Sequence, residues 1–161
     1  MTFEWLGMAV EQLPKGAFLM VKGNPMTIGW AQFGVLWGKP TATVYVRHSR
    51  YTHELLEQEK TFTISVPAHG TMQKELGYCG TRSGRKTNKC ADLGMTLLPA
   101  RFGAQDGLKG CAYQIECRIL QVSELDEQAI NDPMLKSRYY AGGDPHTMYI
   151  GEILGVWSED A

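Results

Sequence analysis

The chain lacks the main sequence features of membrane, nucleic-acid-binding and secreted proteins. No apolar run approaches the roughly 20 residues that a membrane-spanning helix needs. The formal net charge is −1, whereas a nucleic-acid-binding domain would call for a basic face and a high pI. The N-terminal stretch MTFEWLGMAV contains acidic Glu4 and no basic region of the kind that starts a secretory signal. We therefore expect no membrane or nucleic-acid partner and a cytoplasmic location.

The usual metal and nucleotide motifs are also missing. The cysteines form no C-x-x-C pair, so a structural zinc site is not indicated and buried thiols are expected. His48, His53 and His69 do not cluster with cysteines or acids at ligand spacing, and we expect no metal site. There is no P-loop, and no G-x-G-x-x-G follows a strand, so a Rossmann-type nicotinamide site has no support.

Length and composition are those of an ordinary globular domain. The chain has 161 residues, of which 43% are hydrophobic and 20% are charged. These values predict one domain, spanning residues 1–161, that buries most of its apolar surface.

Strand-like stretches outnumber helix-like ones. Alternation and β-branched residues predict strands at 16–22, at the start of 23–40, and at 41–47, 61–67, 95–99, 111–123 and 146–158. Helices are predicted at 50–59, near 70–78 and at 84–93, with Gly94 ending the last. Residues 124–145 are predicted to be irregular, and a slip in parity near Ile119 and Leu120 predicts a bulge or a sheet that curls. The absence of a repeated strand–helix–strand pattern favours an antiparallel barrel with inserted helices.

A first polar stretch, RHSRYTHEL at 47–55, follows one predicted strand and opens a predicted helix. Ser49 or Thr52 can cap that helix, whose free N–H groups suit a phosphate. Arg47 and Arg50 add guanidinium groups that fit phosphate geometry. The alternative is an ordinary capped helix with two solvated arginines.

A second polar stretch, CGTRSGRKTNK at 79–89, is rich in glycine, hydroxyl and cationic side chains. Gly80 and Gly84 permit positive φ angles and a close approach of the backbone to a ligand. The alternative is a solvated surface loop. Two such stretches in one small domain indicate a site for a phosphorylated ligand, provided that they converge in the fold.

Four blocks read in order resemble one known family: NPMTIGWAQFGVLWGKP, VYVRHSRYTHELL, YCGTRSGRKTNK and GGDPHTMYIGEI. They resemble the flavin reductase-like family of FMN-binding split barrels, and within it the flavoredoxin-type branch. The resemblance implies a mainly β fold with inserted helices, built on a six-stranded antiparallel Greek-key split β-barrel. It also implies a homodimer that binds FMN non-covalently close to the dimer interface.

The resemblance also implies roles for individual residues. Met26, Thr27 and Ile28 would lie along the isoalloxazine, with Asn24 beside them. His146 would approach the flavin from the last strand, either as a proton donor or as a hydrogen-bonding histidine. The residues expected around the ribityl phosphate are Arg47, Ser49, Arg50, Tyr51 and Thr52, with Arg85 and Lys89 as further candidates. Those expected against the ring or ribityl chain are Cys79, Gly80, Thr81, Ser83 and Gly84.

Two points about these residues remain open. Cys79 is either a redox thiol or a buried one. His48 departs from the family pattern, because related sequences often have proline at that position.

Two functions follow from the resemblance. The first is an NAD(P)H-dependent flavin reductase or oxidoreductase that passes electrons from NADH or NADPH through bound FMN. The alternative is a non-catalytic, flavoredoxin-like electron carrier fed by a redox-protein donor. In either case the flavin supplies the redox chemistry, so no catalytic side chain is assigned.

Overall fold

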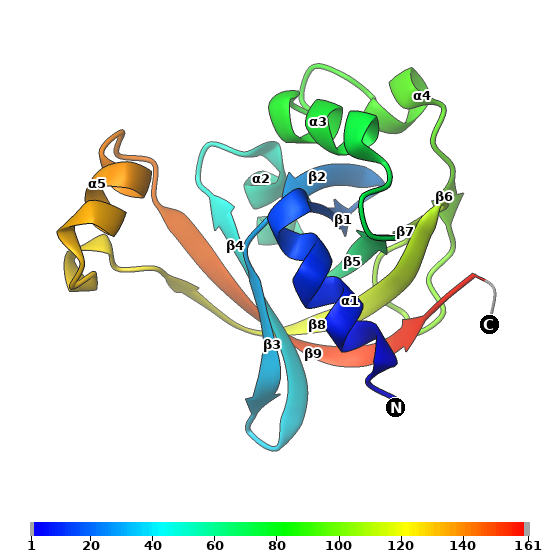
Figure 1. Ribbon diagram of the computed structural model, residues 1–161, viewed down its shortest axis with the longest axis horizontal. Coiled ribbons are helices and arrows are strands. Elements are labelled where there is room, and N and C mark those ends of the chain that lie inside the picture. The colour runs from blue at the N-terminus through cyan, green and yellow to red at the C-terminus, as the bar shows by residue number, and fades with distance from the viewer. Residues whose placement is uncertain (1, 160–161) are drawn as a thin grey trace.

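Seven strands form one antiparallel sheet, in the order β2-β1-β5-β8-β9-β4-β3 (Figure 1). The computed structural model describes residues 2–159, so the predicted domain limits at 1 and 161 lie outside the described residues. The mainly β, antiparallel class with inserted helices is confirmed, and seven strands pair in this sheet. The strands of this sheet are β1 (Ala17–Val21), β2 (Asn24–Ile28), β3 (Ala31–Leu36), β4 (Lys39–Arg47), β5 (Thr61–Pro67), β8 (Cys111–Glu124) and β9 (His146–Trp157).

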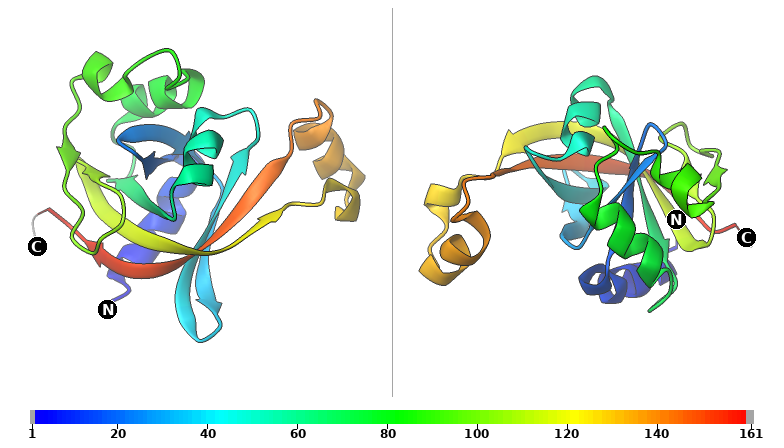
Figure 2. Two further views of the ribbon diagram at one scale, coloured as in Figure 1. Left: turned by 180° about the vertical axis from the view of Figure 1, so that it is seen from behind. Right: turned by 90° about the horizontal axis from the view of Figure 1, so that it is seen from above.

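The helices cover the curved sheet unevenly. In Figure 1, α1 crosses one face of the sheet, while α3 and α4 lie together beside β1 and β2. The two views of Figure 2 show β8 and β9 extending as an arm that bears α5 at its far end. Within residues 2–159, no helix is long and apolar enough to cross a membrane. The helices are α1 (Glu4–Gln12), η1 (Leu13–Lys15), α2 (Tyr51–Gln58), α3 (Gln73–Thr81), α4 (Lys89–Leu93), η2 (Glu127–Ala129) and α5 (Pro133–Tyr140).

Two stretches contain more structure than their sequence predicted. Residues 23–40 form β2, β3 and the start of β4, and the β3–β4 turn places Trp37 and Gly38 at positive φ. Residues 124–145 were expected to be irregular, but they form η2 and α5. Asp132 accepts a hydrogen bond from Met134 N and Pro133 occupies the first turn of α5, a typical helix start. Apart from these two stretches, the connection formed by residues 100–110 contains β7 (Gly107–Leu108), which pairs with β6 (Leu97–Leu98) in a separate two-stranded sheet.

The predicted bulge in the long strand is confirmed. The pairing of β8 with β9 shifts register between Ile119 and Gln121, and a second shift lies between Glu116 and Cys117. A bulge bends its strand and increases the local twist. These shifts fall where β8 and β9 leave the body of the sheet for the arm.

Strand β1 is buried on both faces and anchors the helices that border the site. All five of its residues are buried. Phe18 and Met20 pack with Leu76 and Cys79 of α3, whereas Leu19 and the main core cluster lie on the other face. The end of α3, where the second polar stretch begins, is therefore held against the centre of the sheet.

Strand β5 is also buried on both faces, although the alternation in 61–67 predicts Phe62, Ile64 and Val66 on an inward face and polar residues on the other. Phe62 and Ile64 are buried as expected, but Thr63 and Ser65 are fully buried as well. The 100–110 connection covers them, and Thr63 Oγ1 donates a hydrogen bond to Gln105 O at 2.6 Å. Residues distant in the sequence thus bury a face that local periodicity predicted to be exposed.

Candidate functional site

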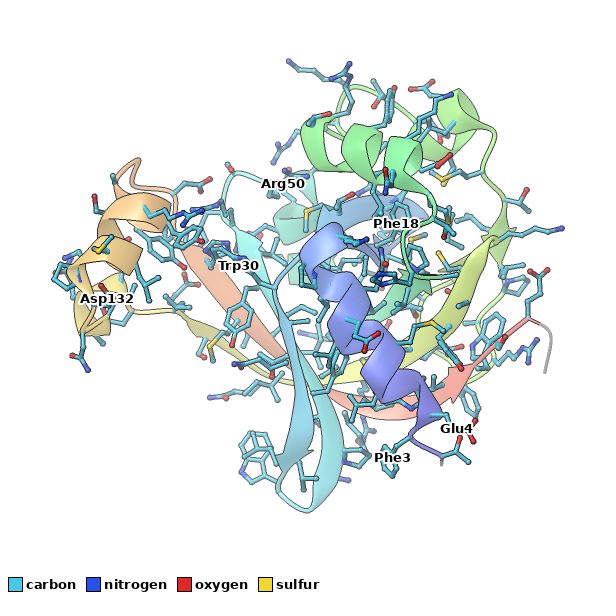
Figure 3. The ribbon with its side chains drawn as sticks, in the orientation of Figure 1. Phe3, Glu4, Phe18, Trp30, Arg50 and Asp132 are labelled. Atoms are coloured by element: carbon cyan, nitrogen blue, oxygen red, sulfur yellow. The ribbon has the colours of Figure 1, made fainter. Side chains whose placement is uncertain are left out.

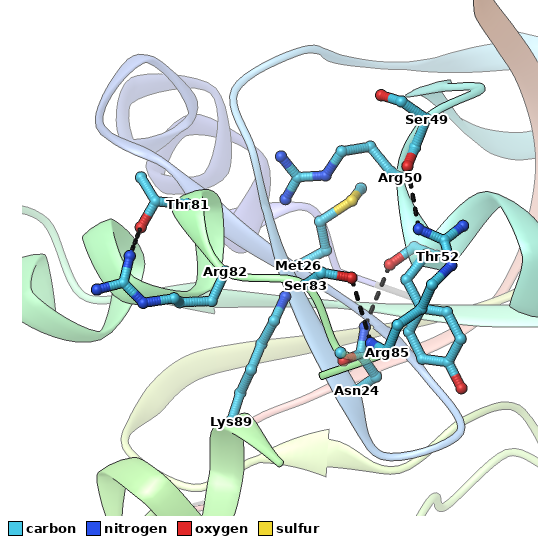
Figure 4. Close-up of a pocket in the computed structure, with 12 residues that line it drawn as sticks. Asn24, Met26, Ser49, Arg50, Thr52, Thr81, Arg82, Ser83, Arg85 and Lys89 are labelled. Atoms are coloured by element: carbon cyan, nitrogen blue, oxygen red, sulfur yellow. Dashed lines mark hydrogen bonds between the residues drawn. The ribbon is translucent and has the colours of Figure 1, made fainter. Parts of the chain in front are cut away.

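The two polar stretches converge on one cavity of about 140 Å³, here called the first cavity (Figure 4). One side comes from the start of α2, another from the end of α3 and the turn after it, and the floor from β2. Among the expected site residues, those that line it are Asn24, Met26, Ser49, Arg50, Tyr51, Thr52, Thr81, Ser83, Gly84, Arg85 and Lys89.

Helix α2 begins at the first cavity, although its cap differs from the prediction. The N-cap is Arg50, which makes no side-chain capping bond, so neither Ser49 nor Thr52 plays that part. Asn24 Nδ2 donates to Thr52 Oγ1 at 3.3 Å and ties β2 to α2. The free N–H groups and partial positive charge at the start of a helix favour an anion.

Arg50 and Lys89 bind the carbonyl groups at the end of α3. Arg50 Nη1 donates to Gly80 O at 3.0 Å, and Arg50 Nη2 donates to Cys79 O at 3.4 Å. Lys89 Nζ donates to Cys79 O at 3.0 Å and to Pro25 O at 2.9 Å. These bonds satisfy carbonyls that a helix C-terminus leaves without partners. They also hold two cations side by side at the first cavity.

Lys89 is the most buried charged group of this cavity. Its residue is 3% exposed, and burial lowers the pKa of its ammonium group to about 8. An ammonium group has three N–H donors, and two of them go to carbonyls within the described part of the chain. The third is available to an anion in the cavity, which would favour the charged form of Lys89.

Other polar groups at the rim already have protein partners. Ser49 Oγ donates to Asp144 Oδ2 at 2.5 Å, and Ser49 N donates to Asp144 Oδ1 at 3.2 Å. Arg85 Nε donates to Glu54 Oε2 at 2.7 Å, and its guanidinium lies over the Tyr51 ring. The rim is thus a network that orders the two stretches relative to each other.

Gly84 allows its backbone to lie close to other groups, but these groups are protein side chains. A Cβ atom at this position would collide with the Asn24 amide and the Tyr51 ring. Among the described residues, the glycines at positive φ do not include Gly80 or Gly84, so neither uses the left-handed backbone that glycine permits. Gly80 and Thr81 belong to α3, and Thr81 Oγ1 donates to Gly77 O within the helix. The helix predicted at 84–93 covers only Lys89–Leu93 and ends at Gly94 as expected.

A second cavity, of about 190 Å³, adjoins the first and shares Met26 and Arg50 with it. Figure 3 shows Trp30 near the arm of β9 and Arg50 on the side toward α3. Arg47, expected with the phosphate group, lines the second cavity and not the first. The second cavity is lined by Met26, Thr27, Ile28, Gly29, Trp30, Tyr45, Arg47, Arg50 and His146.

Arg47 lies among aromatic side chains and carbonyl groups. Its guanidinium lies over the rings of Trp30, at 6.0 Å, and Tyr140, at 5.5 Å. It donates to Asp144 O at 2.6 Å and to Tyr139 O at 2.9 Å. Arg47 therefore fastens the base of the arm to the second cavity.

His146 is a buried, neutral group in the second cavity. Its Nδ1 lies 2.9 Å from the Tyr140 hydroxyl, and its ring lies 4.8 Å from the Trp30 ring. Burial, reinforced by the positive charge of Arg47, lowers the pKa of His146 to about 4. A neutral imidazole favours the hydrogen-bonding role over that of a proton donor near neutral pH.

Most of the expected site residues line one cavity or the other. The exceptions are Cys79 and Gly80, which border the site through their backbone carbonyls. Burial raises the pKa of the Cys79 thiol to about 11, which favours a buried thiol over a reactive one. All four cysteines are free and buried, as expected.

Sequence reasoning assigned no site role to Gly29, Trp30 or Tyr45, all of which line the second cavity. A signal for Tyr45 was present, because strand alternation places it on the same face as Arg47. Trp30 follows the MTIG segment directly and marks the same edge of β2.

The histidines were expected to lie apart from acids, and this is wrong for two of them. His48 and His53 lie beside Glu124, and one potential ligand atom from each of the three falls within 4.8 Å of the others. Glu124 ends β8, whereas His48 and His53 flank the start of α2. Spacing along the sequence could not show this contact, because only the fold brings β8 to the start of α2.

Comparison with known proteins shows the family to which this chain belongs. Residues 12–161 match the model of the flavin reductase like domain, so the chain belongs to the flavin reductase-like family. A protein of Archaeoglobus fulgidus described as uncharacterized is 30% identical over 165 residues, which cover 100% of this chain and 82% of that protein.

Solved structures show the same fold. Flavoredoxin from Methanosarcina acetivorans matches with a TM-score of 0.67 and 26% identity over 90% of this chain and 68% of that one. An FMN-binding protein from Thermus thermophilus matches with a TM-score of 0.67 and 21% identity over 91% of this chain and 71% of that one. Together with the family match, the flavoredoxin neighbour supports a function that involves a flavin.

Proposed function

We propose that this chain binds FMN non-covalently, with the phosphate in the first cavity and the isoalloxazine in the second. The observation that carries the proposal is the shared wall of Met26 and Arg50 between a cationic cavity and an aromatic one. FMN has an anionic phosphate end, which matches the cationic lining of the first cavity. Its flat aromatic ring matches the aromatic lining of the second. The flavoredoxin neighbour supports a flavin as the ligand.

The residues of the first cavity fit a phosphate group. Arg50, Lys89 and the N–H groups at the start of α2 are all donors, and charge-assisted bonds to phosphate are the stronger class of hydrogen bond. Asp144 accepts hydrogen bonds from Ser49 at the rim, which keeps that carboxylate occupied with protein donors. Asn24 and Ser83 add polar groups around the ribityl chain in this proposal.

The residues of the second cavity orient the ring and exclude water from it. Trp30 and Tyr45 supply flat surfaces, Met26 and Ile28 supply apolar contacts, and Arg50 supplies positive charge at the shared wall. A cation close to a flavin stabilises its anionic reduced form. Bound FMN supplies the hydride or electron transfer itself, so the protein needs no nucleophile or general base.

Within this proposal, the activity is that of a flavin reductase or oxidoreductase that takes electrons from NADH or NADPH. The second candidate is an electron carrier fed by a redox-protein donor, and the flavoredoxin neighbour favours it. A neutral His146 fits both candidates, because neither requires a protonated side chain from the protein.

We also propose one domain and a homodimer. The tip of the β3–β4 hairpin exposes apolar side chains, with Val35 77% and Trp37 60% exposed, and a second copy of the chain would cover them. Closure of six strands into a Greek-key split barrel remains a prediction, because the paired strands follow one linear order. Light scattering at micromolar concentration should give the mass of a dimer, and a monomer would contradict this part.

The experiment that tests the proposal compares FMN with riboflavin. We expect FMN to bind at least about tenfold more tightly, because riboflavin lacks the phosphate that the first cavity would hold. Equal affinities would remove the phosphate assignment. Anaerobic addition of NADH or NADPH to the FMN-loaded protein then separates the two activities: rapid bleaching near 450 nm indicates the reductase, and bleaching only by a reduced redox protein indicates the carrier.

A further inference from the structure

A cluster of two imidazoles and a carboxylate lies outside both cavities, on the side of α2 that faces the arm. His48 comes from the loop between β4 and α2, His53 from the first turns of α2, and Glu124 from the end of β8. One ligand atom from each lies within 4.8 Å of the other two. Three separate segments of the chain therefore present N, N and O ligands toward one point.

The hydrogen bonds around the cluster direct the ligand atoms. His48 Nε2 lies 2.5 Å from Glu124 Oε2. Thr147 Oγ1 donates to Glu124 Oε1 at 2.7 Å and lies 2.9 Å from His53 Nε2. Since the Thr147 hydroxyl proton goes to Glu124, its oxygen accepts from His53 Nε2, and a metal bound at that nitrogen would replace this hydrogen bond.

The second nitrogen of His53 also has the partner that a metal ligand needs. His53 Nδ1 lies 3.6 Å from Glu57 Oε1, one helical turn further along α2. When a metal takes the Nε2 lone pair, the ring proton sits on Nδ1, where a carboxylate can accept it. Metal-bound histidines almost always donate their other N–H to such an acceptor, which orients the ring and strengthens the ligand.

We propose that His48, His53 and Glu124 form a binding site for one divalent transition-metal cation of the zinc type. Two imidazoles and one carboxylate form a known zinc donor set, and they leave a fourth position for water. Tetrahedral zinc with bonds near 2.0–2.1 Å separates its ligand atoms by about 3.3 Å. Small side-chain rotations bring the cluster to that spacing, with the cation replacing the His48–Glu124 hydrogen bond.

The charges around the cluster suit a dication. The carboxylates of Glu57 on α2 itself, of Glu124 and of Asp144 all act on His53 and favour positive charge there. The cation would tie the loop that bears Ser49 and Arg50 to the end of β8.

Calorimetric titration of the full, tag-free chain with zinc chloride near pH 7.5, after treatment with a chelator, tests the site. We expect one zinc per chain with a dissociation constant in the micromolar range. His48→Ala and Glu124→Gln should each weaken binding about tenfold or more. Both positions are exposed, so these variants should fold. The matched controls are His69→Ala and Glu11→Gln, which remove an exposed imidazole and an exposed carboxylate elsewhere and should bind zinc like the unmodified chain.

A second readout confirms that the zinc acts on the folded protein. Zinc at about 100 times the dissociation constant should raise the thermal midpoint of the unmodified chain, and this rise should be lost in His48→Ala. No zinc-dependent heat, or equal affinity in all five proteins, would overturn the site. Equal affinity would mean that zinc binds elsewhere on the chain.

Discussion

The two adjoining cavities differ in what their cationic side chains contact. In the first, Arg50 and Lys89 sit side by side and bind the carbonyl groups at the end of α3. In the second, Arg47 is enclosed by Trp30 and Tyr140 and donates to two carbonyls of the arm. The first arrangement presents cations to a ligand, whereas the second uses a cation to build an aromatic wall. An arginine near a site is therefore not by itself a ligand-binding arginine.

If the comparison is correct, changes to the first cavity should separate FMN from riboflavin, and changes to the second should affect both flavins alike.

Arg50→Ala should have the largest effect on FMN. It removes a guanidinium that lines both cavities. Gly80 O loses its hydrogen bond from Arg50, and Cys79 O loses one of its two donors, Arg50 and Lys89. Loss of one or two charge-assisted bonds, each about 1.5–3 kcal/mol, predicts FMN binding weaker by about 100-fold. Fluorescence titration measures it, and Arg118→Ala, which breaks only an ion pair with Glu152, is the charge-matched control. Similar losses in the two variants would contradict a local role for Arg50.

Lys89→Met should weaken FMN binding by about tenfold while leaving riboflavin binding nearly unchanged. The unmodified chain should also lose FMN affinity as the pH rises through about 8, the pKa of Lys89, because the ammonium group then gives up its proton. Titrations between pH 7 and 9 keep the phosphate group largely ionised, since its second pKa is about 6. This pH dependence should be absent in Lys89→Met. The same slope in both proteins would place the titrating group elsewhere.

Gly84→Ala should lower the free energy of unfolding by about 1–3 kcal/mol, because the added Cβ meets the Asn24 amide and the Tyr51 ring. Denaturant unfolding measures the change. Gly142→Ala is the matched control, since a Cβ there meets nothing within 4 Å and its φ is not left-handed. Equal stability of the two variants would show that the turn after α3 packs more loosely than the structure indicates.

Trp30→Ala should have the smallest effect, and it should be the same for both flavins. An aromatic contact is worth about 0.5–1.5 kcal/mol, which predicts FMN and riboflavin affinities lower by about two- to tenfold. The ratio of the two affinities should stay at the value for the unmodified chain. A change in that ratio would mean that the two cavities do not divide the ligand as proposed.

Local sequence signals were accurate where neighbours along the chain decide the structure. The alternation of 41–47 predicted β4, the parity slip near Ile119 predicted a bulge in β8, and Gly94 predicted the end of α4. These features depend on side-chain periodicity and on turn chemistry, which act over a few residues. The convergence of the two polar stretches, which was a condition of the predicted phosphate site, is found in the fold and is not a result of local signals.

Errors arose where distant segments decide the outcome. Thr63 is buried because the 100–110 connection lies over it, and Arg47 enters the second cavity because the arm supplies Asp144 and Tyr139 as acceptors. Gly84 faces Asn24 and Tyr51, which no spacing rule places beside it. The His48–His53–Glu124 cluster has the same origin.

The sequence alone determined most of the strands, the order of the four motifs and the cationic and hydroxyl groups available to a phosphate, because these depend on residue type and short-range spacing. Only the tertiary structure decided which cations meet in one cavity, which are enclosed by aromatic rings, and which histidines lie beside an acid. The physical reason is that packing β1 and β5 on both faces brings α2, α3 and the β8–β9 arm together from separate parts of the chain.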